Sequence, residues 1–326
     1  MRKFFTNIDI LLPGLLVMIV LAWLLPFQDS YETFVPLTEI KFWGVIAVFL
    51  LYGMKLSSKE MKRDLSNWKL HLLTQTATFL VIPILVVVFY PVFMNGEYER
   101  FWQAAFFLSI LPSTVTMSVI FVAKTDGNVG GAIFNSSISG FLGIIITPLW
   151  IGLFLSSKMS SFDATELIIR LTQQIVIPII VGMALRYFLE KAVLAVLKKL
   201  KNLDKYVVMI IVYSSFSTAF NRQMFEIIPT HQLLSLIAIV VSLHLTVFEL
   251  LGVVARVFKL EWRDRMVLLF CGSQKSLVHG SVFALLVFEN PEMQIFALLP
   301  VMIYHAFQLL FASYKSIVIH SRESVL

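Results

Sequence analysis

The residues most suited to chemistry lie in the middle of an apolar stretch. Residues 268–288 read LLFCGSQKSLVHGSVFALLVF, with apolar ends around Gln274, Lys275 and His279. A charged lysine at the centre of a membrane span costs roughly 3 kcal/mol on insertion scales, and its stem is too short to reach water from this depth. We therefore expect Lys275 to contact an anionic substrate, to titrate during transport, or to form a structural ion pair.

A second polar cluster follows Pro112, also within an apolar stretch. Proline removes one backbone hydrogen bond of a helix, and nearby hydroxyl groups can satisfy the freed carbonyl groups. One interpretation is a kinked helix whose serines bond to their own backbone. The other is a broken helix that meets the polar middle of residues 268–288, and the occurrence of two such segments favours it.

A third group of polar residues, Asn135 and Ser136, lies in the glycine-rich stretch 127–143. The glycines are typical of close helix packing, whereas an amide within a membrane span usually faces a partner or a cavity. The resulting candidates for a substrate or coupling site are Ser113, Thr114, Thr116, Ser118, Asn135, Ser136, Ser273, Gln274, Lys275 and His279. Glu249 is the best candidate in the sequence for an ion-pair partner of Lys275. We find no metal-ligand spacing and no catalytic signature, so we expect neither a metal site nor an enzyme.

The composition indicates which elements must position these residues. The chain has 326 residues, of which 58% are hydrophobic and 14% charged, too apolar for a soluble protein of this size. Spans of about 20 apolar residues predict a polytopic all-α membrane protein. The ten expected spans are 10–26, 38–55, 71–93, 101–125, 128–155, 167–189, 204–220, 231–257, 265–289 and 292–317.

The loops between these spans alternate in charge. Lysine and arginine are frequent between spans 6 and 7, as in Lys198 and Lys199, and rare on the opposite side, where Arg100, Lys158 and Arg222 lie. This asymmetry predicts an inner (plasma) membrane protein with both termini in the cytoplasm. The net charge of +6 then serves orientation, and without a basic stripe with interleaved aromatics we expect no nucleic-acid partner.

Internal repetition sets the predicted domain plan. Five spans followed by five more must be inverted relative to each other, which divides the chain into repeats 1–158 and 159–326. Spans 1 and 6 both begin with an apolar residue and a proline, Pro13 and Pro178. Spans 4 and 9 both carry a small polar cluster. Paired interrupted helices of this kind are typical of secondary transporters, whose binding site lies near the membrane midplane.

With these motifs the chain resembles the bile acid:sodium symporter family. The stretches LPSTVT, DGNVGGAIFNSSISGFLGIIITP and CGSQKSLVHG carry the resemblance, which covers nearly the whole chain and is closest to the divergent branch of the seventh solute-carrier member and its bacterial homologues. It implies a core domain of helices 3–5 and 8–10 with discontinuous crossing helices 4 and 9, and a panel domain of helices 1, 2, 6 and 7. It also implies transport of an amphipathic organic anion by alternating access.

The sodium-binding pattern of that family is altered here. The resemblance implies that Phe270 stands where sodium-coupled members have a glutamate, and that Lys275 stands where they have an asparagine. A glutamine ligand falls on Thr78, with Gln75 one turn earlier as an alternative. Further ligands of spans 4 and 5 fall near Thr116 to Ser118 and on Ala132 and Ser136. The ammonium group of Lys275 would then take the place of sodium, which leaves proton coupling or no coupling.

The sequence therefore predicts a secondary carrier for a small organic anion, such as a bile-acid-like solute, in the lipid bilayer. Two alternatives stay open at this point. One is a sodium-coupled symporter that uses other oxygen ligands. The other is a transporter-like regulator of ion homeostasis without substantial flux.

Overall fold

The computed structural model describes residues 11–55, 67–93, 99–154, 169–223, 230–288 and 290–323, and these ranges contain helices and no strand. The chain divides into two compact units, each formed from several separate segments. The first comprises residues 1–57, 163–229 and 281–295, and the second comprises residues 58–162, 230–280 and 296–326. The predicted repeat boundary at 158–159 lies outside the described residues.

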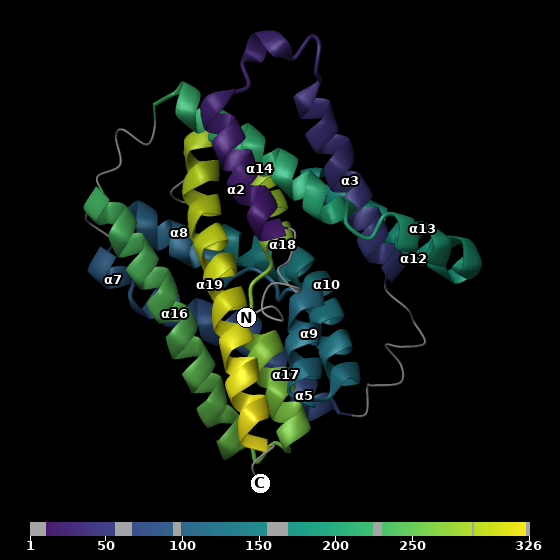
Figure 1. The fold of residues 1–326 in the computed structure, drawn as a ribbon, viewed down its shortest axis with the longest axis vertical. Helices are drawn as coiled ribbons and strands as arrows, with labels where there is room; N and C mark the ends of the chain where they lie inside the picture. Colours follow the sequence, from purple (N-terminus) through teal and green to yellow (C-terminus); the bar gives the residue numbers. More distant parts are fainter. Residues whose placement is uncertain are drawn as a thin grey trace. The chain divides into compact units, whose positions relative to one another are not determined.

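The first unit contains two helix pairs. Its elements are α2 (Leu11–Leu24), η1 (Asp29–Tyr31), α3 (Leu37–Lys55), η4 (Thr172–Val176), α12 (Ile177–Phe188), α13 (Glu190–Lys199) and α14 (Leu203–Asn221). Helix α14 packs along α2, and α12 packs along α3 (Figure 1). The carboxylate of Glu32 accepts a 2.7 Å hydrogen bond from the backbone N–H of Thr38. This bond caps the start of α3 and lowers the pKa of Glu32.

The contact between α3 and α12 depends on two glycines. A Cβ atom on Gly53 would overlap the carbonyl oxygen of Ile179, and one on Gly182 would overlap that of Leu50. The two backbones therefore touch with no side chain between them, as small residues permit at membrane helix interfaces.

The second unit is built around α17. Its elements are α5 (Trp68–Thr76), η2 (Ala77–Val81), α6 (Ile82–Val88), α7 (Tyr90–Phe93), α8 (Glu99–Ser109), α9 (Thr116–Lys124), α10 (Val129–Phe154), α16 (Thr230–Val257), α17 (Trp262–Ser273) and most of α19 (Pro291–Glu323). Helix α18 (Leu277–Val287) begins in this unit and ends in the first. Helix α17 packs against α5, α9, α10 and α16, and its apolar residues form the centre of the core.

Most of the predicted spans correspond to single helical runs. Seven described runs are long and apolar enough to cross a membrane: 37–55, 68–88, 129–154, 169–188, 203–221, 230–257 and 293–319. Predicted span 1 is the shorter apolar helix α2. Predicted spans 4 and 9 are each divided into two helices below this length, α8 with α9 and α17 with α18. The chain is thus a multi-pass membrane protein. Spans 4 and 9 are divided at the two polar clusters that the sequence analysis identified.

Candidate functional site

The two interrupted spans meet at their breaks. Helix α8 ends at Ser109 and α9 begins at Thr116, while α17 ends at Ser273 and α18 begins at Leu277. The backbone N–H of Ser276 donates a 2.8 Å hydrogen bond to the carbonyl oxygen of Pro112. The non-helical stretches of the two spans therefore pair with each other directly.

The side chain of Lys275 lies at the centre of this junction. Its Nζ donates hydrogen bonds to three backbone carbonyl oxygens, of Thr78 at 2.8 Å, Ser109 at 2.6 Å and Leu111 at 2.8 Å. Lys275 is 1% exposed. An ammonium group has three donors and no acceptor, so three carbonyl oxygens match its charged form. Bonds of this short, charge-assisted kind are stronger than neutral ones.

Local sequence explains why these carbonyl groups are free to accept. Residues 77–81 form a π turn in which the N–H of Ile82 donates to the carbonyl of Ala77. The next residue, Pro83, has no N–H, so the carbonyl of Thr78 has no donor within its own helix. Ser109 is the last residue of α8, where carbonyl groups of a helix also have no internal partner, and Leu111 lies two residues beyond it in the non-helical break. The negative end of the α8 dipole further favours a cation there.

Two other helices, α19 and α10, satisfy further backbone groups of the breaks. Gln308 of α19 accepts a 2.8 Å hydrogen bond from the N–H of Lys275 and donates a 2.9 Å bond to its carbonyl, and Tyr304 donates to the carbonyl of Ser273. On the other break, Thr147 of α10 donates to the carbonyl of Ile110. A non-helical backbone at membrane depth requires such partners.

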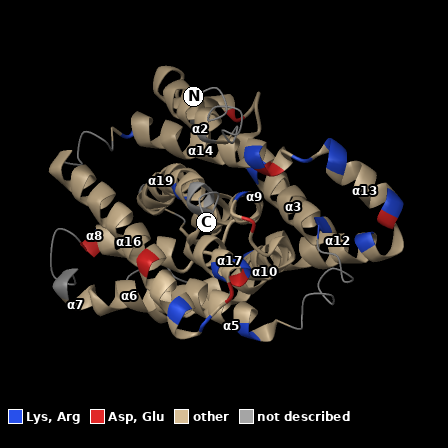
Figure 2. Ribbon diagram, turned by 60° about the horizontal axis from the view of Figure 1, so that its bottom comes forward, with Lys and Arg blue, Asp and Glu red and all other residues tan. Residues whose placement is uncertain are grey.

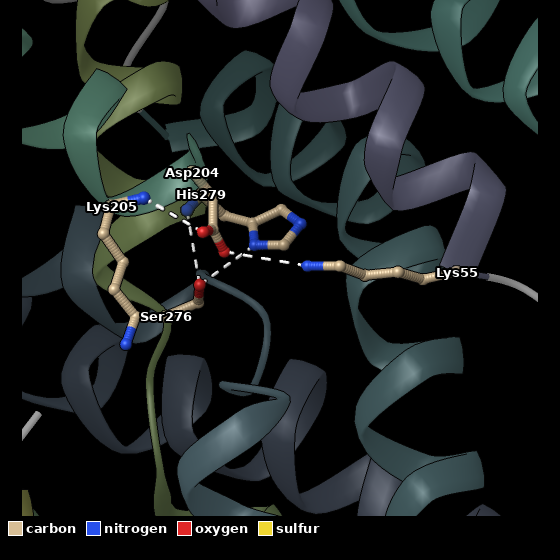
Figure 3. Close-up of polar contacts among 5 residues, drawn as sticks. All are labelled: Lys55, Asp204, Lys205, Ser276 and His279. Carbon is tan, nitrogen blue, oxygen red and sulfur yellow. Dashed lines mark hydrogen bonds and ion pairs between the residues drawn. The ribbon is translucent and has the colours of Figure 1, made fainter. Parts of the chain in front are cut away.

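Several predicted site residues join this junction. The Oγ of Ser118 donates to Gln274 Oε1 at 2.9 Å, and the N–H of Ser113 donates to Ser139 Oγ at 2.9 Å. His279 Nδ1 lies 2.9 Å from Ser276 Oγ, and that oxygen also accepts the N–H of His279, which caps α18 (Figure 3). Ser273, Gln274 and Lys275 themselves form the break of the ninth predicted span.

Other predicted residues lie apart from Lys275. Asn135 bonds to His71 Nδ1 at 2.9 Å and accepts a bond from Gln75 Nε2, which forms a separate polar group between α5 and α10. The Oγ of Ser136 lies 3.5 Å from Cys271 Sγ. Thr114 and Thr116 are half-buried and exposed, respectively, at the start of α9.

The predicted pairing of Glu249 with Lys275 is not found. The carboxylate of Glu249 is mostly exposed and lies 3.6 Å from the Nζ of Lys315, and backbone carbonyl oxygens take up the three donors of Lys275. Glu249 lies toward the end of its span, where a lysine can reach it from water, and no described carboxylate lies within ion-pairing distance of Lys275. Nor do the described histidines, cysteine and carboxylates include a group of three that could hold a metal ion.

Comparison with known proteins assigns this geometry to a family. A sequence profile of the SBF-like CPA transporter family matches residues 9–321. The chain belongs to this family. Membership of this family identifies it as a membrane transporter.

Several relatives align with this chain over most of its length and most of their own. An uncharacterized protein of Pseudomonas aeruginosa is 31% identical over 91% of this chain and 88% of its own. The "Putative symporter YfeH" of Escherichia coli K12 is 29% identical over 94% and 92%. "Sodium/bile acid cotransporter 7" of Danio rerio is 30% identical over 85% and 83%.

In this member of the SBF-like family, position 270 is part of the apolar core. Phe270 is fully buried, and its ring centroid lies 5.9 Å from the rings of both Phe121 and Phe248. Its side chain cannot contribute an oxygen ligand.

A separate cavity of about 400 Å³ lies within the second unit, among α6, α8 and α16. Its lining is apolar except for Ser242 and Thr246, and it contains none of the predicted site residues. No lysine or arginine lines this cavity, and Lys275 is not among its lining residues.

Sequence reasoning missed the residues that support Lys275. Ser109 and Leu111 contribute carbonyl groups, which no residue type reveals. Gln308 and Tyr304 did carry a signal, because a polar group within a membrane span is costly and is expected to have a partner. That signal identifies Gln308 as paired, but not with which backbone group.

Proposed function

We propose that this protein is a secondary active transporter of a small organic anion, in which the ammonium group of Lys275 takes the place of a coupling sodium ion. The observation that carries the proposal is the contact of Lys275 Nζ with the carbonyl oxygens of Thr78, Ser109 and Leu111. Helix ends and unwound carbonyl groups are the ligands that hold coupling cations in broken-helix transporters. Here a side chain uses them.

The substrate class is inferred from the relatives. The Danio rerio relative is named as a sodium/bile acid cotransporter, and bile acids are amphipathic organic anions. Coupling is inferred from this chain's own residues: Phe270 stands among aromatic rings at the position where the resemblance implies a sodium-binding glutamate. We therefore propose transport without sodium, either coupled to protons or uncoupled.

Helix packing supports the inverted-repeat plan that alternating access requires. Predicted spans 1 and 7 pack together as α2 and α14, and spans 6 and 2 pack together as α12 and α3. Exchange of span 1 with 6 and of span 2 with 7 converts one pair into the other. In the second unit, α5 of span 3 packs against α17 of span 9, and α16 of span 8 packs against α8 of span 4. Exchange of span 3 with 8 and of span 4 with 9 likewise converts one pair into the other. The grouping of helices into two compact units supports the division into a core and a panel.

The membrane orientation forms part of the same proposal. The basic loops favour an inner-membrane location with both termini in the cytoplasm. Substrate would then be exchanged between the cytoplasm and the other side of that membrane.

Counterflow in proteoliposomes tests the proposal. The full chain is reconstituted, and uptake of labelled bile acid conjugates and steroid sulfates is followed while sodium and pH are varied separately. We expect uptake that is equal in sodium chloride and in choline chloride, either unaffected by a pH gradient or increased by it.

Each of the other outcomes contradicts one part of the proposal. Uptake that requires sodium and ignores pH would exclude Lys275 as the substitute for sodium and favour a symporter with other ligands. Absence of counterflow for every anion, with the protein folded, would contradict transport and favour a regulator.

A further inference from the structure

The segment that joins α12 to α14 carries an uncompensated positive charge. Residues 186–205 contain six basic and two acidic side chains. Both carboxylates already face other bases, because Glu190 lies 3.6 Å from Arg186 and Asp204 lies 3.8 Å from Lys55 (Figure 3). Of the five lysines, Lys205 is half-buried, and the other four are Lys191, Lys198, Lys199 and Lys201. All four are exposed, and none lies within ion-pairing distance of a described carboxylate.

The same segment exposes large apolar side chains. Tyr187 and Phe188 are each 77% exposed, Leu189 is 53% exposed and Leu194 is 49% exposed. In water such side chains would forfeit the free energy of burial. At the end of a membrane span they are favourable, because aromatic and aliphatic groups there lie at the boundary between headgroups and hydrocarbon.

The orientation of α13 is fixed by its packed face. Val193 is buried against Leu51 and Met54 of α3, while Lys191, Leu194 and Lys198 follow at spacings of three and four residues on exposed positions. Figure 2 shows the basic residues spread along α13. The helix thus presents lysine and leucine together on its outward surface.

The position of α13 relative to the membrane follows from chain connectivity. Helix α12 ends at Phe188 and α13 begins at Glu190, so one residue separates a membrane span from this helix. Helix α13 therefore starts at the depth where the span leaves the hydrocarbon layer. A basic helix with apolar side chains at that depth is typical of elements that lie in the membrane interface.

We propose that residues 186–201, which we call the basic elbow, bind the phosphate groups of anionic lipids in the surrounding bilayer. The four unpaired lysines contact the headgroups, and Phe188, Leu189 and Leu194 insert beside the acyl chains. A soluble phosphate compound would use the lysines but leave the apolar side chains in water, and so would a nucleic acid. The combination of both kinds of side chain fits a lipid surface.

Lipid binding to the full chain tests the basic elbow. Delipidated protein is titrated with phosphatidylglycerol and, separately, with phosphatidylcholine, and bound lipid is counted by native mass spectrometry. Each basic side chain near an anionic surface contributes a factor of about five. The combined variant K191Q, K198Q, K199Q and K201Q is expected to bind phosphatidylglycerol at least about tenfold more weakly, with phosphatidylcholine binding unchanged.

A matched variant removes the same charge elsewhere. K69Q, R256Q, K259Q and R263Q replace four exposed basic residues of the second unit and are expected to reduce phosphatidylglycerol binding much less. Equal losses in the two variants would show general charge attraction and overturn the proposal, as would unchanged binding in the elbow variant. Competition by glycerol phosphate at the same concentration as the lipid would also overturn it. Thermal unfolding of both variants checks that they are folded.

A second variant isolates the apolar part. Leu194→Cys in a Cys271→Ser background carries the single reporter site for an environment-sensitive fluorophore in reconstituted protein. We expect brominated acyl chains to quench it. A label that only an aqueous quencher reaches would contradict insertion of the elbow.

Discussion

At the scale of residues, Lys275 shows how a charge can be kept at membrane depth with no carboxylate of the described residues beside it. Its three donors meet three carbonyl oxygens, which are free because of Pro83, the end of α8 and the non-helical break that follows α8. The side chain and the breaks therefore depend on each other: the ammonium needs dipoles, and the unwound backbone needs donors.

Replacement of Lys275 by alanine should destabilise the fold strongly. The change leaves three buried carbonyl groups without donors, which at about 1–3 kcal/mol each predicts a loss of several kcal/mol. We further expect sodium to recover part of the melting temperature of the variant, since the vacated oxygens suit a small cation.

Thermal unfolding in sodium chloride and in choline chloride measures this effect. The wild-type protein is the control and should melt at the same temperature in both salts. Two results would contradict the idea that Lys275 takes the place of sodium. One is a melting temperature of the wild type that depends on sodium, and the other is a melting temperature of the Lys275→Ala variant that does not.

Gln308 is expected to be nearly as important for stability. Its amide pairs with both the N–H and the carbonyl of the Lys275 peptide, so Gln308→Met leaves two buried groups unpaired and should cost about 2–4 kcal/mol. Gln308→Glu keeps the acceptor and should cost less. Gln103→Met on α8, a half-buried glutamine, is the control, and thermal unfolding of the three variants compares them. Equal melting of Gln308→Met and Gln103→Met would refute this role.

At the scale of elements, the sequence predicts the breaks well and their partners poorly. Pro112 and the polar run around Lys275 indicate where spans 4 and 9 are interrupted, because proline and buried polar groups oppose a continuous helix in lipid. The π turn before Pro83 and the choice of Glu249 as a partner show the limit. Which carbonyl group is left free depends on the turn actually formed, and which group reaches Lys275 depends on how distant helices pack.

The glycine contact between α3 and α12 predicts a sharp contrast among glycine substitutions. Gly53→Ala and Gly182→Ala place a Cβ against backbone oxygen, and we expect each to lower stability by about 2 kcal/mol or more, because a backbone cannot move aside as a side chain can. Gly152→Ala has no atom within 4 Å of its new Cβ and should gain about 0.5–1 kcal/mol of helix propensity. Melting temperatures of the three variants in one detergent compare them. A similar effect at all three positions would show that the contact is not tight.

At the scale of the whole molecule, composition and loop charge carry most of the prediction. The apolar content predicts a multi-pass helical protein, and the seven long helical runs agree with it. The short helix α13 does not emerge from a search for spans, since its lysines read as a loop until its buried face at Val193 is known. Loop charge predicts orientation by counting alone and needs no packing.

Reporter fusions test that orientation. Green fluorescent protein fused after Leu326 should fluoresce, and alkaline phosphatase at the same point should be inactive, because the charge of the loops predicts that the termini face the cytoplasm. Alkaline phosphatase inserted after residue 96, between predicted spans 3 and 4, should be active. The reverse pattern would invert the assigned topology.

The amino group of Lys275 is covalently attached to the chain, so it cannot leave the junction by dissociation as a bound ion can. A free ion obeys mass action and leaves its ligands when the medium is diluted. An amino group that is part of the polypeptide is present once per chain in any medium. The carbonyl oxygens of the junction therefore have their donor group beside them once the chain folds, even in surroundings that contain almost no salt.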